Sequence, residues 1–114
     1  MHVSVMGNPD DSVLVTVRGN LDIDSATVLA TALEQVLEQH APRVVIDLSG
    51  IEFCDSTGLS AFVTGYNRAS AKGGWLRLAA PGEFLAQLLD TVGIAGRVGV
   101  YATVGDAIAG RADG

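Results

Sequence analysis

A short run of polar residues, Asp55-Ser56-Thr57-Gly58, offers the clearest chemistry in this sequence. It follows the apolar stretch 44–46, which is typical of a buried strand, and it precedes apolar residues at helical spacing. The Ser56 hydroxyl should therefore be exposed in the first turn of a helix, where free backbone amides accommodate an anion. We interpret Ser56 as a residue that carries a phosphate reversibly, rather than one that attacks a substrate.

Simpler roles for these residues stay open. Serine is common in the first helical turn as a capping residue, and Asp55 is a candidate N-cap of this helix. Asp55 is also a candidate for presenting Ser56 to a kinase, and the two roles are compatible. Thr57 is the second choice as phosphate acceptor, because it is one residue away but turned around the helix by about 100°.

Catalysis by Ser56 fits the sequence less well. A nucleophile elbow requires Gly-x-Ser-x-Gly, but Cys54 stands in place of its first glycine. The two histidines, His2 and His40, are not expected to reach Ser56 as a general base. The sequence also lacks nucleotide-binding motifs and metal-ligand spacing of Cys and His. We therefore expect neither enzymatic activity nor a cofactor or metal of the protein's own.

Length, composition and charge describe a single domain over residues 1–114, with a core at about 3–109 and a flexible tail at 110–114. Hydrophobic residues make up 48% of the chain, and the formal net charge is −6. This charge, with only seven scattered Lys and Arg, disfavours nucleic acid and anionic membranes as partners. An acidic surface fits a basic protein partner, or serves solubility alone.

Cysteine content and hydropathy point to the cytoplasm. The only cysteine, Cys54, allows no internal disulfide and is expected to be a small buried apolar residue. No apolar run approaches the roughly 20 residues of a membrane span. The N-terminus lacks the basic start and apolar stretch of a signal peptide. We expect a soluble cytoplasmic protein.

Hydrophobic periodicity predicts alternating strands and helices. Strands are expected at 3–5, 13–18, 44–48, 75–79 and 98–101. Helices are expected around the apolar residues of 26–37, 59–69, 84–92 and 104–108, and the second of them ends at Gly73-Gly74. Asp24 or Ser25 is expected to cap the first helix, and a capping box from Thr103 to Asp106 opens the last.

This order predicts an α/β domain with a mixed, mostly parallel sheet of four or five strands, an antiparallel edge hairpin and about four helices. Parallel strands bring their carboxyl ends to one edge, where open α/β sheets place functional sites. The turns 19–24, 53–58 and 80–82 should gather there. Asp22 and Asp24 then become neighbours of Asp55 and Ser56. They are also candidates for a divalent ion, although capping and solvation explain them more simply.

The sequence from about Val13 to Ile108 resembles the STAS-domain anti-sigma-factor antagonists of bacteria. The stretch 45–59 carries most of the resemblance, since its Asp-Ser-Thr-Gly-Leu is similar to the family's Asp-Ser-Ser/Thr-Gly-Leu signature. The turn 19–22 is similar to the family's Gly-Glu-Leu-Asp turn, with Asn20 in place of Glu. Cys54, in place of a larger apolar residue, is a second departure.

The resemblance implies a regulatory switch. In the family, the serine after the signature aspartate, here Ser56, is phosphorylated by the cognate anti-sigma factor, a serine kinase that uses ATP. A separate serine phosphatase restores the hydroxyl. The unphosphorylated antagonist binds the anti-sigma factor and frees the sigma factor for transcription. The expected partner surface comprises Asp22, Asp24, Asp55, Ser56, Thr57 and Gly58.

Two alternatives belong to other functional classes. The first is a STAS scaffold or small-ligand-binding module that never cycles through phosphate. The second is an enzyme that uses Ser56 as its nucleophile.

Overall fold

Alternating valines build the hairpin at one edge of the sheet. In the computed structural model, which describes residues 2–110, β1 (His2–Gly7) pairs antiparallel with β2 (Val13–Leu21). Val3 lies opposite Val17 and Val5 opposite Val15. Period-2 apolar residues face one side of a strand, so this hairpin has one apolar face. The predicted edge hairpin is confirmed.

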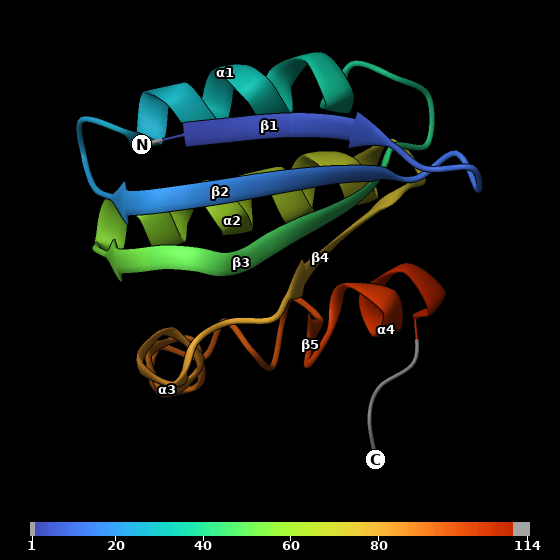
Figure 1. The fold of residues 1–114 in the computed structure, drawn as a ribbon. Coiled ribbons are helices and arrows are strands. Elements are labelled where there is room, and N and C mark those ends of the chain that lie inside the picture. Colours follow the sequence, from blue (N-terminus) through green and yellow to red (C-terminus); the bar gives the residue numbers. More distant parts are fainter. Residues whose placement is uncertain (1, 111–114) are drawn as a thin grey trace.

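The remaining strands add in parallel and in sequence order (Figure 1). The sheet has five strands in the order β1-β2-β3-β4-β5, which agrees with the predicted four or five strands in a mixed, mostly parallel sheet. The elements after the hairpin are α1 (Ala26–Leu37), β3 (Arg43–Cys54), α2 (Ser56–Ala71), β4 (Trp75–Ala79), α3 (Glu83–Thr91), β5 (Val100–Tyr101) and α4 (Val104–Ala109). The helices lie close to their predicted positions, and Thr103 caps α4 by accepting from the Asp106 N–H at 3.0 Å.

The third strand is much longer than the predicted 44–48. Its second half pairs with β2, so that Leu21 lies opposite Cys54. Two register shifts, between Thr16 and Arg18 and between Gly19 and Asn20, fit extra residues into β3. Ser49 and Gly50 are residue types that are common in turns. Here they lie within a bulged strand. Gly50 is needed there, because a Cβ would lie only 2.7 Å from Cγ of Arg18.

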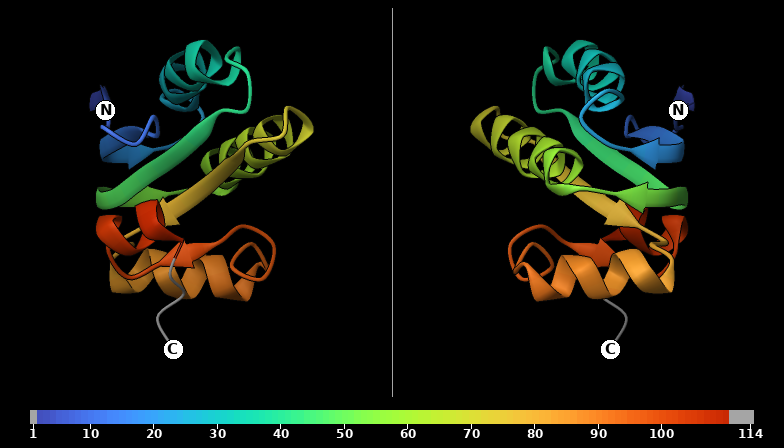
Figure 2. Two further views of the ribbon diagram at one scale, coloured as in Figure 1. Left: turned by 90° about the vertical axis from the view of Figure 1, so that its right-hand side faces the viewer. Right: turned by 90° about the vertical axis from the view of Figure 1, so that its left-hand side faces the viewer.

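Two apolar layers hold the helices on opposite faces of the sheet (Figure 2). The larger layer joins the sheet to α1, α2 and α3, and its fully buried members include Val15, Ile46, Leu29, Phe62 and Leu89. The smaller layer, around Val45, Ala79 and Ala107, holds α4 on the other face. Within residues 2–110, no helix combines the length and apolar character needed to cross a bilayer.

Candidate functional site

The carboxyl ends of β2 and β3 meet at one edge of the sheet (Figure 1). Leu21 and Cys54 are opposite each other, and the backbone N–H of Asp55 donates to the Leu21 carbonyl at 3.0 Å. The loop that begins at Asp22 therefore lies beside the first turn of α2. The expectation that these two turns gather is confirmed.

The turn at residues 80–82 does not join them. β4 pairs with β3 only from Arg43–Trp75 to Asp47–Ala79, so β4 ends level with Asp47 while β3 continues to Cys54. The prediction that the turn 80–82 lies beside the other two turns is therefore wrong. The sequence did not reveal the extra length of β3. The segment after α3 takes its place, as Val92 and Ile94 line a shallow hollow together with Ser56.

Asp55 is the N-cap of α2. Its backbone is extended, with φ −101° and ψ −176°, and its Oδ1 accepts from the Gly58 N–H at 3.0 Å. The predicted capping role is confirmed. This bond fixes Ser56 as the first residue of the helix, where its side chain is exposed. The Ser56 carbonyl also accepts from the hydroxyl of Ser60, one turn later in the helix, at 2.9 Å.

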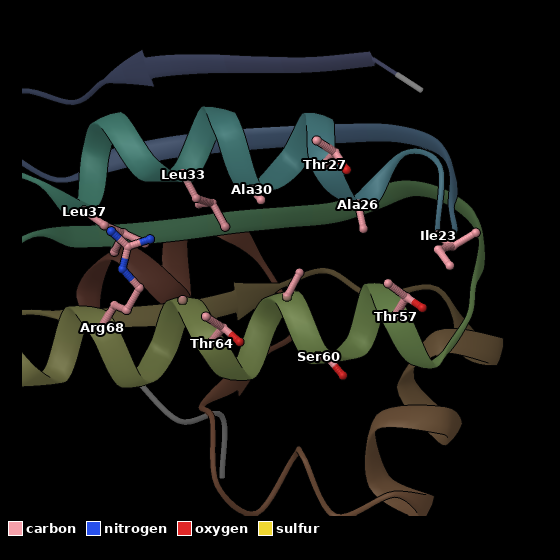
Figure 3. Close-up of a pocket in the computed structure, with 12 residues that line it drawn as sticks. Ile23, Ala26, Thr27, Ala30, Leu33, Leu37, Thr57, Ser60, Thr64 and Arg68 are labelled. Carbon is pink, nitrogen blue, oxygen red and sulfur yellow. The ribbon is translucent and has the colours of Figure 1, made fainter.

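Ser56 and Thr57 face different depressions on α2. Ser56 lines the hollow toward Val92 and Ile94. Thr57 lines the groove between α1 and α2, opposite Ile23 (Figure 3). This divergence agrees with the turn of about 100° between consecutive helical residues. A group attached to one hydroxyl therefore points to a different part of the surface from a group attached to the other.

Hydrogen bonds fold the loop after β2 around Asp22. The Asp22 carboxylate accepts from the backbone N–H groups of Asp24 at 3.1 Å and Ser25 at 3.0 Å. The Ser25 hydroxyl lies 3.0 Å from the same carboxylate and 2.7 Å from the Asn20 carbonyl. Donation from the Ser25 backbone, and then from its hydroxyl, lowers the pKa of Asp22 below its ordinary value. Asp22 is thus a fixed anion at this edge.

The expected side-chain cap on α1 is not formed. Ser25 occupies the N-cap position, but its side chain makes no capping hydrogen bond. The backbone of Ser25 is already helical, with φ −90° and ψ −16°, and its hydroxyl accepts instead from the Asp22 N–H at 2.9 Å. Asp24 is exposed in the same loop and donates its own N–H to Asp22.

Gly58 and Cys54 lie beneath the exposed turn. A Cβ on Gly58 would be 2.6 Å from Cγ of Leu21 and 3.0 Å from Sγ of Cys54, so only glycine fits. Cys54 is 3% exposed, in agreement with its predicted apolar role. Burial, and then the negative charge of Asp55, raises the pKa of the Cys54 thiol to about 11. Gly58, expected at the partner surface, is buried and positions the residues above it.

Neither histidine belongs to the two turns that meet at Ser56. His2, on β1, lies opposite Arg18 of β2. The strand β2 therefore separates His2 from β3. His40 follows α1 and precedes the start of β3, whereas Ser56 follows the end of that strand. No group of three His, Cys, Asp or Glu in residues 2–110 is arranged to hold a metal ion.

Sequence reasoning missed the exposed apolar residues around Ser56. Ile23 is 69% exposed between two acidic residues, and Val92 is 50% exposed. Ile23 could have been identified from the sequence, because an isolated isoleucine between two aspartates in a turn is expected to be exposed. The apolar spacing of the third helix predicted that Val92 faces inward, and this is wrong: Val92 follows the last residue of α3 and is half exposed beside Ser56.

Comparison with known proteins agrees with this fold. The family described as Mlab, STAS domain, matches residues 5–102. The anti-sigma-B factor antagonist of Bacillus subtilis (strain 168) is 35% identical over 94 residues, which cover 82% of this chain and 84% of that protein. An anti-sigma factor antagonist from Mycobacterium paratuberculosis has a similar structure, with a TM-score of 0.86, 27% identity, and coverage of 98% and 94% of the two chains.

The anti-sigma factor antagonist SpoIIAA shares the fold. Its unphosphorylated form has a TM-score of 0.78 at 17% identity, over 94% of this chain and 93% of that one. The phosphorylated form from Bacillus has a TM-score of 0.73 at 16% identity, over 95% and 97%. From the matched family and its relatives, the chain belongs to the STAS-domain anti-sigma-factor antagonist family.

Proposed function

We propose that this protein binds an anti-sigma factor in its unphosphorylated form and thereby releases a sigma factor for transcription. Phosphorylation of Ser56 by the same anti-sigma factor, acting as a serine kinase with its own ATP, switches binding off. A serine phosphatase reverses the switch, and the cycle runs in the cytoplasm. The observation that carries the proposal is the exposed Ser56 at the first position of α2, fixed there by the Asp55 cap.

The fold tolerates a phosphate on Ser56. The phosphate adds roughly 1.5 to 2 negative charges, and the helix N-terminus favours them by about 0.3–1 kcal/mol. The nearby carboxylates of Asp22 and Asp55 oppose this. Because these contributions are small and opposite in sign, the domain keeps its structure after modification.

A packed interface does not tolerate the same phosphate. Burying a doubly charged group without a partner cation costs several kcal/mol, and every 1.4 kcal/mol or so changes affinity about tenfold. Phosphate on Ser56 therefore weakens the complex by orders of magnitude while the antagonist itself hardly changes. The switch acts by blocking the contact.

The surface around Ser56 favours a basic protein partner. Asp22, Asp24 and Asp55 supply negative charge around an exposed isoleucine, Ile23. Apolar side chains ringed by charge are typical of protein docking sites. Thr57 contributes from the neighbouring groove, and Gly58 contributes only by positioning the turn. The net charge of −6 disfavours nucleic acid or an anionic membrane as the partner.

The protein is proposed to be a binding protein and not an enzyme. Nucleophilic serine needs a base within hydrogen-bond reach. His2 lies on the edge strand and His40 beside the other end of β3. A serine-directed phosphonate probe tests this, since labelling of Ser56 would favour an enzyme.

The phosphorylation test uses the protein with its co-encoded kinase and ATP. After digestion, mass spectrometry should place one phosphate on Ser56, and the Ser56→Ala variant should take up none. Phosphate on Thr57 alone would refute the assignment, because the Thr57 hydroxyl faces a different depression from that of Ser56.

A second function, binding of a small amphipathic anion, is favoured by the groove between α1 and α2 (Figure 3). The groove encloses about 460 Å³ between apolar side chains such as Leu33 and Ala30. Arg68 lines it, and no carboxylate of residues 2–110 lies within salt-bridge distance of that guanidinium. Decanoate should bind the protein and lose affinity in Arg68→Gln, whereas the neutral decanol should bind both forms equally.

A further inference from the structure

The two edges of the sheet are protected very differently. β5 has only two residues, Val100–Tyr101, and α4 follows it directly. β1 has six residues, His2–Gly7, in unbroken register with β2 on one side only. An exposed edge strand offers backbone N–H and C=O groups to another strand, and proteins commonly block it with Lys, Pro, bulges or very short strands. β5 is protected because it is very short, but β1 has none of these protective features.

An uncharged hollow of about 480 Å³ lies beside this open edge. Val3 and Val5 form its wall on β1, and α1 supplies Thr27, Val28, Thr31, Ala32, Gln35 and Val36. Val5 is 50% exposed and Val28 is 47% exposed. Exposed apolar side chains that adjoin an unpaired strand edge indicate an interaction surface.

We propose that β1 pairs antiparallel with β1 of a second copy of this chain, so that one sheet continues across a twofold axis. A strand that pairs with its own copy places identical patches against each other, so any charge on the patch would face its like. Each copy carries a net charge of −6, yet the hollow contains no ionisable side chain and residues 3–7 carry no charge. This edge is therefore suited to self-association in spite of the overall repulsion.

The dimer leaves the phosphorylation surface free. Neither Ser56 nor Thr57 lines the hollow, and β2 separates β1 from β3, the strand that leads into α2. Each copy can engage one anti-sigma factor, and the dimer would be bivalent. The pairing itself does not rest on the proposed function, because it requires only the edge strand and the face of α1.

Molar mass in solution tests the proposal. Light scattering or sedimentation equilibrium over a wide concentration range should give the mass of two chains for the natural protein. Val28→Glu puts a carboxylate opposite its own copy and should give the mass of one chain. Phe84→Glu is the matched control, because Phe84 is 58% exposed on α3, outside the hollow, and that variant should stay dimeric. A monomer at every concentration, or equal masses for both variants, would overturn the proposal.

A cross-link tests the strand pairing itself. Ser4 lies near the middle of β1, and Cα atoms directly opposite in an antiparallel pair are about 4.5–5.5 Å apart, within the range that a disulfide spans. Mild oxidation of Ser4→Cys should give a covalent dimer, because the natural Cys54 is buried. Ser70→Cys, at an exposed site on α2, should stay uncross-linked. The cross-link requires the twofold axis to pass beside Ser4, and a dimer sensitive to Val28→Glu but without this cross-link would overturn that register of the strand pairing.

Discussion

Gly58 packs directly on Leu21, and the contact leaves no room for a side chain. A Cβ at position 58 would lie 2.6 Å from Cγ and 2.9 Å from Cδ2 of Leu21. The same Cβ would lie 3.0 Å from Sγ of Cys54. The glycine that ends the Asp-Ser-Thr-Gly run is thus required by the packing of the first turn of α2 onto the ends of β2 and β3. The small side chain of Cys54 fits the same crowded position.

Replacement of Gly58 should therefore destabilise the domain. A methyl group forced into a filled space costs about 1–3 kcal/mol. Gly58→Ala should lower the free energy of unfolding by this amount in urea denaturation, through a lower midpoint at an unchanged slope.

Gly105 provides the control for that experiment. It lies in the first turn of α4, and the nearest atom to its added Cβ is 3.9 Å away. Gly105→Ala should keep or raise stability by up to about 1 kcal/mol, since helical glycine is entropically unfavourable. Equal stability of Gly58→Ala and the natural protein would show that Leu21 can move aside.

The cap on α2 predicts a second change in stability. Asp55→Ala leaves the Gly58 N–H without its acceptor and should cost about 0.5–2 kcal/mol. Asp55→Asn keeps an oxygen in the same place and should retain most of the stability. Thermal or urea unfolding of the natural protein and the two variants distinguishes the capping bond from the charge. If both variants lost the same amount of unfolding free energy, the effect would come from the carboxylate charge alone.

The Asp22 network predicts a shift that NMR can measure. Ser25→Ala removes the hydroxyl donor but keeps the backbone N–H of residue 25. The pKa of Asp22 should rise part of the way to its ordinary value, because the backbone bonds continue to lower it. A side-chain carbonyl titration gives the value directly. An unchanged pKa would mean that the backbone bonds alone hold the carboxylate ionised.

Local patterns were sufficient to predict most of the fold. Alternating valines identified the edge hairpin, and the three- and four-residue spacing of apolar positions identified the helices. The acidic loop and Ser56 were placed together because parallel strands end at one edge. These inferences need only periodicity and strand direction, and both are written in the nearby sequence.

The predictions that were wrong concern features that depend on contacts between segments distant in the sequence. The extension of β3 to Cys54 is stabilised by pairing with β2 and contains Ser49-Gly50, which is typical of a turn. For the same reason the turn 80–82 was wrongly predicted to lie beside the end of β3. Asp24 or Ser25 was expected to cap α1, but in the folded loop the Ser25 hydroxyl accepts from the Asp22 N–H and donates to the Asn20 carbonyl instead.

Cys54 predicts a dependence of stability on alkaline pH. The folded protein raises the thiol pKa from 9.0 to about 11, so it holds the proton more tightly than the unfolded chain does. The stabilisation is therefore complete below pH 9 and is lost as the pH rises toward about 11. The difference in unfolding free energy between the natural protein and Cys54→Ala should be constant at neutral pH and fall across this window. A constant difference throughout would contradict the buried neutral thiol.

The last prediction concerns the affinity for the anti-sigma factor. Ser56→Ala should bind as tightly as the unmodified protein and should stay bound after incubation with kinase and ATP, because it has no hydroxyl to modify. Ser56→Asp should bind at least about tenfold more weakly, since a carboxylate buried at the contact without a cation is costly. Thr57→Asp places the same charge in the neighbouring groove of the proposed partner surface, and titration calorimetry should show a smaller loss for it than for Ser56→Asp. Since the two hydroxyls face different depressions about 100° apart around the helix, a larger loss for Thr57→Asp than for Ser56→Asp would move the contact to the α1–α2 groove and would reject Ser56 as the switch.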